Sequence, residues 1–400
     1  MIDIKKALKI IEKETGSLKN EKEPLTSSVG RILAEDIVAD TDLPPFDRSQ
    51  MDGYAVRAAD TVNAPTKLRV VGESAAGRGW PKTLKPGQAI RIMTGAPVPA
   101  GADAMQKVEL THEHDDIVEI RESVKIENNI VRRGAEIKRG TAVFGSGKMI
   151  TENMIATLAS FGYAKVKVGK RPRISILGTG SEIVDISKKP GRDQIRNSNS
   201  VMLDVLCRRF GGQTTILPIV RDEISDLKFQ ILDAAKRSNV LIITGGVSVG
   251  KYDHTKAALS ELGAEIFFEK VRLKPGKPTV FARLHGSLVF GLPGNPVSAT
   301  TAFYLFVADA IRKMQGGTEK VLAKGTAISA GLIKGTKERD SYLPCTLSYQ
   351  KDGLAVITPL RGLGSSDFVT FAAADCLAVI PRGTNVETGS SVSFLTLPQR

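Results

Sequence analysis

Four glycine-rich segments in the middle of the chain carry residue types suited to phosphate or oxyanion chemistry. They read LGTGSEIV (177–184), ITGGVSVGKYDHTK (243–256), LKPGKP (273–278) and GLPGNPVSAT (291–300). Glycine lets backbone N–H groups come close to an anion, and helix N-termini favour negative charge. We therefore expect these segments to bind a phosphate or another oxyanion.

Acidic residues and lysines lie on or beside the same segments. Glu182 follows the TG turn, Asp222 follows the apolar LPIV run, and Asp253 closes the GGVSVGKYD loop. Lys274 and Lys277 flank the PG of LKPGKP. Mg²⁺ prefers acidic oxygens together with waters and substrate phosphates, while ammonium groups hold the remaining oxyanions. The residues therefore indicate metal-assisted phosphate chemistry.

The elements around these segments should bring them together. From 171 to about 317, apolar runs at 173–177, 240–243 and 287–290 alternate with helical stretches at 199–211, 223–238 and 298–314. This alternation predicts a parallel, doubly wound sheet. In such a sheet the loops at the carboxyl ends of the strands converge on one crevice, so the four segments should meet there.

The flanking regions have different patterns. Residues 2–14 have the apolar spacing of an amphipathic helix, and 151–162 predict a second helix. Short alternating stretches from 54 to 140 predict a small β-rich insert. After Gly317 short strands with glycine-rich turns predict a terminal β-barrel or sandwich.

Composition bears on the cellular location of the protein and on the state of its cysteines. The 400 residues are 42% hydrophobic, with no run near the roughly 20 apolar residues of a membrane helix. The start, MIDIKKALKII, lacks a signal-peptide core, so we expect a cytoplasmic protein. The three cysteines, Cys207, Cys345 and Cys376, lack metal-site spacing, and we expect them to be buried and unpaired.

The net charge of +13 raises nucleic-acid binding as a minor alternative. Lysine and arginine are spread along the chain, aromatic residues make up only 5%, and no recognised nucleic-acid motif occurs. A basic surface that attracts small anions is the simpler interpretation, and we expect neither nucleic acid nor membrane as a partner.

Several motifs along the chain carry a family resemblance. They are DLPPFDRSQMDGYAV (42–56), RIMTGAPVPAGADA (91–104), TGSEI (179–183), RNSNSVMLDVL (196–206), TGGVSVGKYD (244–253), LKPGKP, GLPGNPVSAT and, more weakly, GSSDFVTFAAADCLAVIPRG (364–383). In number and order they resemble the molybdopterin molybdenumtransferase family, which comprises the MoeA proteins and the gephyrin E domain. The resemblance runs from the N-terminal segment to the last strand.

This resemblance implies a multidomain α/β plus β architecture. It implies an elongated connecting domain (1–45 plus 141–170), a β-rich insert domain (46–140), a MogA-like molybdopterin-binding α/β domain (171–317) and a C-terminal β-barrel domain (318–400). It also implies a homodimer in which the second domain of one subunit approaches the third domain of the other. The crevice would then be shared between chains.

The implied activity is the last step of molybdenum cofactor synthesis. Adenylylated molybdopterin and molybdate are the substrates, and molybdate is delivered to the dithiolene. The phosphoanhydride is hydrolysed with release of AMP in a Mg²⁺-dependent reaction. A MogA-type adenylyltransferase is the implied partner that supplies the pterin. The choice between molybdate and tungstate stays open.

The resemblance assigns roles residue by residue. Catalytic positions are Asp52, Glu182, Asp222 and Asp253, of which Glu182, Asp222 and Asp253 would coordinate Mg²⁺ or activate the hydrolytic water. Substrate-binding positions are Thr94, Gly245, Gly246, Ser248, Lys274, Lys277, Pro293, Asn295, Pro296, Ser298, Arg339 and Ser366. Asp52 and Thr94 would reach toward the partner subunit's crevice, and the two lysines would hold molybdate or phosphate oxygens.

The sequence departs from the family pattern at three acidic positions. The usual Gly-Glu-Asp triplet reads Gly134, Ala135, Glu136; Ser181 stands where the family has aspartate, and Asn197 replaces the aspartate before a Ser-Asn pair. These changes leave open a catalytically weak or silent scaffold paralogue. A molybdopterin adenylyltransferase is a further alternative, but those chains lack the flanking β domains that the MDGYAV segment and the terminal strands predict.

Overall fold

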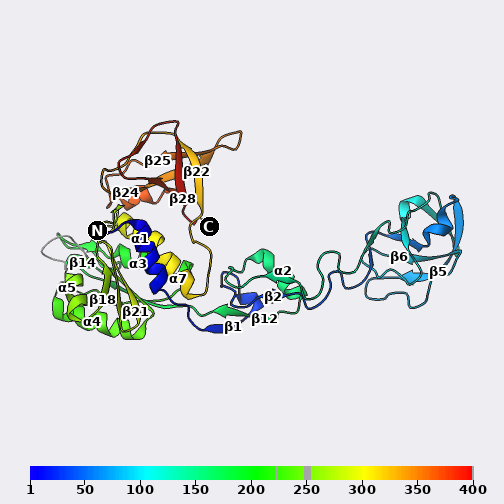
Figure 1. Ribbon diagram of the computed structural model, residues 1–400, viewed down its shortest axis with the longest axis horizontal. Coiled ribbons are helices and arrows are strands. Elements are labelled where there is room, and N and C mark those ends of the chain that lie inside the picture. The colour runs from blue at the N-terminus through cyan, green and yellow to red at the C-terminus, as the bar shows by residue number, and fades with distance from the viewer. Residues whose placement is uncertain (221–222, 247–253, 399–400) are drawn as a thin grey trace. The chain divides into compact units, whose positions relative to one another are not determined.

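The computed structural model describes residues 1–220, 223–246 and 254–398, so the predicted site residues Asp222, Ser248 and Asp253 lie outside the described residues. The chain forms two compact units (Figure 1). Unit 1 comprises Met1–Glu35, Ser146–Ile155 and Lys165–Arg400, and unit 2 comprises Asp36–Gly145 and Ala156–Ala164. The four-domain division predicted from the sequence stays a prediction.

The centre of unit 1 is a six-stranded sheet with the order β16-β13-β17-β21-β20-β18. Its strands are β13 (Arg173–Gly178), β16 (Gln213–Ile216), β17 (Val240–Thr244), β18 (Glu265–Phe268), β20 (Val280–Leu284) and β21 (Ser287–Leu292). Strands β16, β13, β17 and β21 are parallel, as predicted. The three predicted strands, β13, β17 and β21, are therefore parallel, whereas β20, which the sequence analysis did not name as a strand, runs antiparallel to β21. His285 and Gly286 join these two strands with φ values of 48° and 81°, which is the geometry of a tight hairpin turn.

Helices cover both faces of this sheet. They are α1 (Ile4–Glu14), α3 (Ser198–Arg209), α4 (Ile224–Arg237), α5 (His254–Glu261), α6 (Pro296–Ala302), the π-helical segment η4 (Phe303–Val307) and α7 (Ala308–Met314). Successive residues of β17 alternate between the two cores, since Ile242 packs in one and Leu241 and Ile243 in the other. The first core also contains Phe303 of η4, and the second contains Ile231 of α4. The doubly wound α/β architecture is therefore confirmed.

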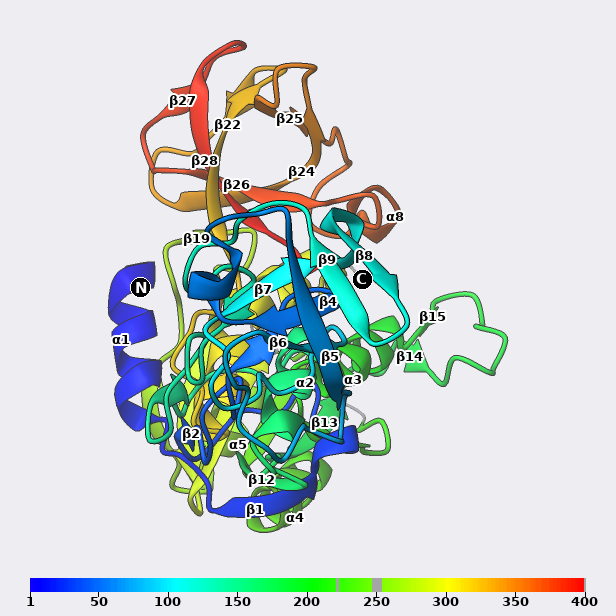
Figure 2. The ribbon, with the colours of Figure 1, turned by 90° about the vertical axis from the view of Figure 1, so that its right-hand side faces the viewer.

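The C-terminal strands close into a barrel, as predicted. The barrel strands are β22 (Lys324–Ser329), β24 (Asp340–Tyr349), β25 (Ala355–Pro359), β26 (Cys376–Ile380) and β28 (Ser391–Thr396). Each pairs with two neighbours, and the pairing of β24 with β26 closes the ring. Strand β19 (Leu273–Lys274) adds to β24 at its edge, and α8 (Phe368–Phe371) follows β25. Figure 2 shows these strands curving around a common axis.

The barrel packs directly on the α/β layers within unit 1. Leu377 of β26 and Leu397 belong to the same buried cluster as Phe303 and Ile311. Two of the cysteines, Cys345 and Cys376, are buried in the separate core of the barrel, and Cys207 lies on α3 and is buried in the cluster that includes the sheet residues Ile174 and Ile176. The expectation of buried, unpaired cysteines is therefore confirmed.

Unit 2 is built on a second six-stranded sheet with the order β7-β4-β6-β5-β9-β8. Its strands are β4 (Gly53–Val56), β5 (Thr66–Ser74), β6 (Gln88–Ile92), β7 (Ala104–Lys107), β8 (Thr111–His114) and β9 (Ile117–Ile120). The predicted β-rich insert thus forms a sheet with a core on each face, since Tyr54 and Val56 pack in one cluster and Ala55 in the other.

The remaining described elements are short. They are β1 (Asn20–Pro24), η1 (Leu25–Ser27), β2 (Ile37–Val38), β3 (Arg48–Ser49), η2 (Ala58–Thr61), η3 (Val108–Leu110), β10 (Ile130–Val131), β11 (Ala142–Phe144), α2 (Glu152–Ser160), β12 (Lys165–Gly169), β14 (Ile183–Val184), β15 (Ile195–Arg196), β23 (Ile333–Lys334) and β27 (Asn385–Val386). In the described parts of the chain, none of the helices has the length and apolar character needed to cross a membrane. The cytoplasmic location stays a prediction.

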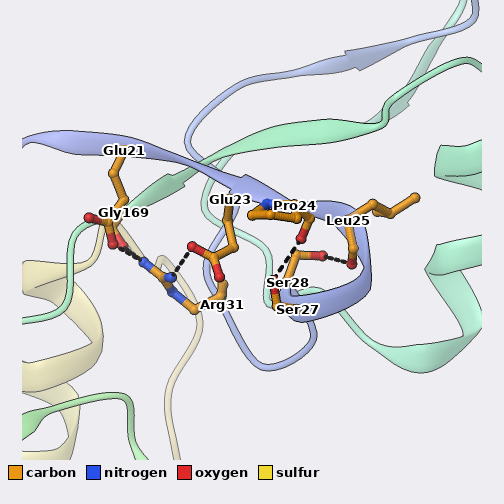
Figure 3. Close-up of polar contacts among 8 residues, drawn as sticks. All are labelled: Glu21, Glu23, Pro24, Leu25, Ser27, Ser28, Arg31 and Gly169. Atoms are coloured by element: carbon orange, nitrogen blue, oxygen red, sulfur yellow. Dashed lines mark hydrogen bonds and ion pairs between the residues drawn. The ribbon is translucent and has the colours of Figure 1, made fainter.

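A buried arginine fastens the β1–β12 ribbon of unit 1 (Figure 3). The Arg31 side chain is only 4% exposed, and its guanidinium donates to the carboxylates of Glu21 and Glu23 and to the carbonyl of Gly169 at 2.9 Å. Glu21 and Glu23 lie on β1, and Gly169 ends β12. One guanidinium therefore holds both strands of the ribbon.

We expect Arg31→Ala to lower the free energy of unfolding by about 3 kcal/mol, because removing one partner leaves carboxylates and a carbonyl without their buried donor. Thermal or denaturant unfolding followed by circular dichroism measures this change. Glu21→Gln is the matched control and should cost under about 1 kcal/mol, since Glu21 is partly exposed. Equal losses in the two variants would show that the arginine does not hold the ribbon.

Candidate active site

A cavity of about 610 Å³ opens within unit 1 where the carboxyl ends of β17 and β21 face the barrel. We call it the oxyanion chamber. Three of the four glycine-rich segments line it, through Gly245 and Gly246, through 274–278, and through 293–295 with Val297 and Ser298. Glu182 comes from the fourth segment. The barrel supplies Arg339 and parts of 360–371. The structure thus brings the four predicted segments together on one cavity.

Three cationic side chains share the wall of the oxyanion chamber. Lys274 ends β19, Lys277 follows the Pro-Gly turn, and Arg339 precedes β24. All three are half-buried, and none forms an ion pair with any residue that the structure describes. Like charges on one partly desolvated wall repel one another, so a bound anion would stabilise all three. The chamber is therefore built to hold a negatively charged ligand.

Glycine brings the backbone close to the chamber. Gly245 follows β17 with φ of 92°, and a Cβ built on it would lie 2.1 Å from the carbonyl oxygen of Thr179. No other residue fits there without moving the backbone. Pro293 and Ser298 are buried in the neighbouring segment, and Ser298 lies in the first turn of α6.

Two described carboxylates line the oxyanion chamber, and they differ in role. Glu182 is exposed, and its carboxylate lies over Gly180, where a built Cβ would be 2.5 Å from Oε2. Asp367 instead accepts from the N–H groups of Leu363 (2.9 Å) and Thr370 (3.0 Å) and from the Thr370 hydroxyl (2.8 Å). These bonds lower the pKa of the Asp367 carboxyl. Glu182 therefore stays available to a ligand, whereas Asp367 holds its own loop.

The described residues do not by themselves form a metal site. Among them, no group of three histidine, cysteine, aspartate or glutamate residues could hold a metal ion. Of the three predicted ligands only Glu182 falls in the described chain, because Asp222 and Asp253 lie outside it. The structure thus describes one of the three predicted metal ligands.

Sequence reasoning missed Ser365, which attaches the barrel loop to the α/β domain, and Asp367, which holds that loop in shape. The Asn295 amide donates to Ser365 Oγ at 2.8 Å, and the Val297 N–H donates to the Ser365 carbonyl at 3.2 Å. Asp367 caps α8 through the Thr370 N–H. The Asp-x-x-Thr spacing is an N-cap signal and could have identified Asp367. The contact of Ser365 depends on folding and has no local signal.

A second cavity of about 670 Å³ adjoins the first. We call it the second chamber. Both cavities are lined by Glu182, Gly245, Gly294 and Asn295, so they form one continuous crevice. The predicted residues Pro296 and Ser366 line the second chamber and not the first. The crevice therefore has room for a charged group at one end and an attached, larger group at the other.

The two predicted residues of the insert meet in unit 2. The backbone N–H and the hydroxyl of Thr94 donate to Asp52 Oδ1 at 2.7 and 2.9 Å. These two bonds lower the pKa of the Asp52 carboxyl. Both residues are exposed, so the pair presents a fixed, ionised carboxylate to solvent or to another chain.

Two of the departures have local structural roles. Asn197 caps α3, and its side-chain oxygen accepts from the Ser200 N–H at 3.2 Å. Asparagine serves as an N-cap as well as aspartate does, so the replacement keeps the helix start. Glu136 forms an ion pair with Arg48 at 3.4 Å on unit 2.

The fold and the crevice define a multidomain α/β and β protein whose doubly wound domain and barrel enclose a crevice with three cationic side chains on its wall. Family descriptions match three successive regions of the chain. They are "MoeA N-terminal region (domain I and II)" over residues 2–162, "probable molybdopterin binding domain" over 175–313 and "MoeA C-terminal region (domain IV)" over 326–397.

Curated relatives and a solved structure agree with these matches. The chain is 36% identical to a molybdopterin molybdenumtransferase of Staphylococcus epidermidis over 96% of this chain and 92% of that protein. It is 34% identical to one of Staphylococcus aureus over 98% and 95%. A crystal structure of the molybdopterin biosynthesis MoeA protein from Pyrococcus horikoshii, 30% identical, superposes with a TM-score of 0.85 and covers 100% of both chains. The chain belongs to the MoeA family.

We expect the Asp52 carboxyl to titrate below the ordinary aspartate pKa of about 3.9. The lowered pKa means that the Asp52–Thr94 interaction stabilises the fold above about pH 3.9 and is lost as the pH falls through the lower, folded value. Carbon-detected NMR titration of the carboxyl measures it. Thr94→Val should raise the midpoint only in part, because the backbone N–H still donates. An unshifted midpoint in the wild type would contradict the pairing.

Proposed function

We propose that the chain is a molybdopterin molybdenumtransferase that inserts molybdate into adenylylated molybdopterin, hydrolyses the phosphoanhydride and releases AMP. The observation that carries this proposal is the set of three cations, Lys274, Lys277 and Arg339, that face one cavity without ion-pair partners among the described residues. Molybdate is a compact dianion with oxygens on every side, so it can accept from all three at once. The relatives that bear this name support the same reaction.

In the proposed reaction the two substrates occupy different chambers of the crevice. In our proposal the oxyanion chamber holds molybdate, with the lysines as point charges and the Arg339 guanidinium as a planar, multiple donor. The pterin substrate extends along the crevice past Gly245 and Asn295 into the second chamber. Holding both reactants in one cavity replaces a collision in solution by a reaction between bound neighbours.

We propose Mg²⁺ as the cofactor of the hydrolytic step. Glu182 supplies an exposed carboxylate on the crevice wall, and Asp222 and Asp253 stay the predicted second and third ligands. A bound Mg²⁺ would offset the charge of the phosphate oxygens.

We also propose a homodimer in which Asp52 and Thr94 of one subunit complete the crevice of the other. The support is the exposed, fixed carboxylate of Asp52, which has no cationic partner among the described residues of its own chain. A MogA-type adenylyltransferase is the proposed partner that delivers the adenylylated pterin.

We expect Lys277→Ala to raise the KM for molybdate about 10- to 100-fold, because one charge-assisted hydrogen bond to the oxyanion is lost. Formation of molybdenum cofactor from adenylylated molybdopterin, molybdate and Mg²⁺ gives the measurement. Lys351→Ala is the matched control, since it removes the same charge from an exposed turn of the barrel. Asp253→Ala tests the predicted metal ligand in the same assay. A wild-type KM in Lys277→Ala would remove this lysine from the proposed site.

We expect the impaired variants Asp52→Ala and Lys277→Ala, assayed at a molybdate concentration that is limiting for Lys277→Ala, to complement each other when mixed and allowed to exchange subunits. In a mixed dimer one crevice carries both changes and the other carries neither, so about a quarter of all crevices would be intact after random exchange. The activity of the mixture, compared with each variant alone, is the readout. Native mass spectrometry establishes that the subunits have exchanged. If activity does not recover once they have, the shared crevice is rejected.

A binding role without turnover is the second candidate. The barrel exposes apolar side chains close to the crevice, since Leu363 is 97% and Val369 73% exposed. Such residues are what a peptide-binding surface would need. The cofactor assay separates the candidates, because a scaffold would bind substrates without forming product.

A further inference from the structure

Four residues from distant parts of the chain form a closed ring of polar contacts in unit 1. The Asp3 carboxylate accepts from the guanidinium groups of Arg272 at 3.2 Å and Arg382 at 2.6 Å. The backbone N–H of Asp340 donates to the carbonyl of Arg272 at 2.9 Å, and the Asp340 carboxylate accepts from the backbone N–H of Arg382 at 2.9 Å. We call this arrangement the Asp3 ring. It joins the residue before α1, the residue before β19, the first residue of β24 and the turn after β26.

Two members of the Asp3 ring are close in sequence to cations of the oxyanion chamber. Arg272 lies two residues before Lys274, and Asp340 directly follows Arg339. The bond from the Asp340 N–H to the Arg272 carbonyl belongs to the parallel pairing of β19 with β24, in which Leu273 lies opposite Asp340. The Asp3 ring therefore fixes the backbone that carries both cations.

The N-terminal segment also braces β19 through its backbone. β19 is a strand of two residues at the edge of the barrel sheet, and in the described chain it pairs with β24 alone. Ile2 bridges Val271, and the Ile2 carbonyl accepts from the Arg272 N–H at 2.8 Å. The side chain of Asp3 and the backbone of Ile2 thus add to the few ladder bonds that hold this strand.

The Asp3 side chain is engaged in the ring and not in its own helix. Asp3 is the N-cap residue of α1, a position where aspartate commonly accepts from the first N–H groups of the helix. Its side chain makes no such capping bond in the described helix. The hydrogen bonds from Arg382 and Arg272 lower the pKa of the Asp3 carboxyl, so it is ionised at neutral pH. One negative charge thus holds two arginines that would otherwise repel each other.

We infer that Asp3 is a positioning residue for oxyanion binding, acting through the Asp3 ring on Lys274 and Arg339. The inference rests on the proposed function, because the oxyanion is the molybdate of that reaction. Single ion pairs at this exposure contribute little, but several charges in one network fix a geometry together. A displaced cation loses affinity because hydrogen bonds weaken steeply with distance and angle.

Asp3→Asn provides the test, because asparagine keeps the size and the N-cap preference of aspartate and removes its charge. The dissociation constant for molybdate, measured by calorimetry on the intact chain, should rise about three- to tenfold. In the cofactor assay the KM for molybdate should rise by a similar factor, while kcat at saturating molybdate stays at the wild-type value. A merely structural role would lower the melting temperature and leave the KM unchanged.

Arg382→Gln opens the Asp3 ring at a second member and should raise the dissociation constant by a similar factor. The double variant should bind no more than about twofold more weakly than either single variant, since one broken contact already opens the ring. A fully additive loss would show that the two residues act separately and would reject the ring.

Glu261→Gln is the matched control. The Glu261 side chain is 49% exposed, against 47% for Asp3, and it pairs with Lys228 at 2.9 Å between α5 and α4. Glu261 lines neither chamber of the crevice. Its loss should leave molybdate binding unchanged. The inference is overturned if the wild type binds no molybdate, if both ring variants bind it as the wild type does, or if Glu261→Gln weakens binding equally.

The cofactor assay distinguishes this failure from failure of the proposed function. A wild type that forms cofactor, with unchanged molybdate binding in both ring variants, keeps the reaction and rejects the inference. A wild type that forms no cofactor, but binds molybdate more tightly than the ring variants do, rejects the reaction and keeps the role of Asp3.

Discussion

The fold holds three positive charges close together without giving them acidic partners in the described chain. Lys274 and Lys277 belong to one segment and Arg339 comes from the barrel, so the packing of the barrel on the α/β layers brings the third charge to the same cavity against their repulsion. That packing is apolar, through Leu377 and Leu397 against Phe303 and its neighbours. Hydrophobic burial remote from the site thus stabilises an arrangement that electrostatics alone would disfavour.

Gly245 brings the backbone of the crevice to a place where no side chain would fit. It has a φ of 92°, and a Cβ built on it would lie 2.1 Å from the carbonyl oxygen of Thr179. Buried polar atoms without partners, by contrast, are not confined to the crevice. Among the described residues they include Arg31 Nε and Ser287 Oγ, which lie elsewhere in the fold.

The sequence predicted the elements well where the signal is local. The apolar spacing at Ile4, Leu8 and Ile11 predicted α1, and the alternation of strands and helices predicted the doubly wound domain. The sequence analysis did not name β20, which runs antiparallel to β21, and the pattern of a buried strand carries no information on its direction. The His-Gly turn before β21 was the available signal.

The segments that line the site could be predicted from the sequence, but the hydrogen bonds that join them could not. Glycine-rich loops at strand ends converge for topological reasons, which allowed Glu182, Lys274 and Lys277 to be named from the sequence. Ser365 could not be named, since its bonds to Asn295 and Val297 exist only after the barrel docks. The bond from the Asn199 amide to the carbonyl of Gly294 likewise joins residues that are 95 apart in the sequence.

The most direct test of the account is to locate molybdate in crystals of the protein soaked in molybdate, by anomalous scattering from molybdenum. The account predicts one strong peak in the oxyanion chamber, within hydrogen-bond reach of Lys274, Lys277 and Arg339. Ordered molybdate elsewhere on the protein, with no density in this chamber at saturating concentration, would contradict it.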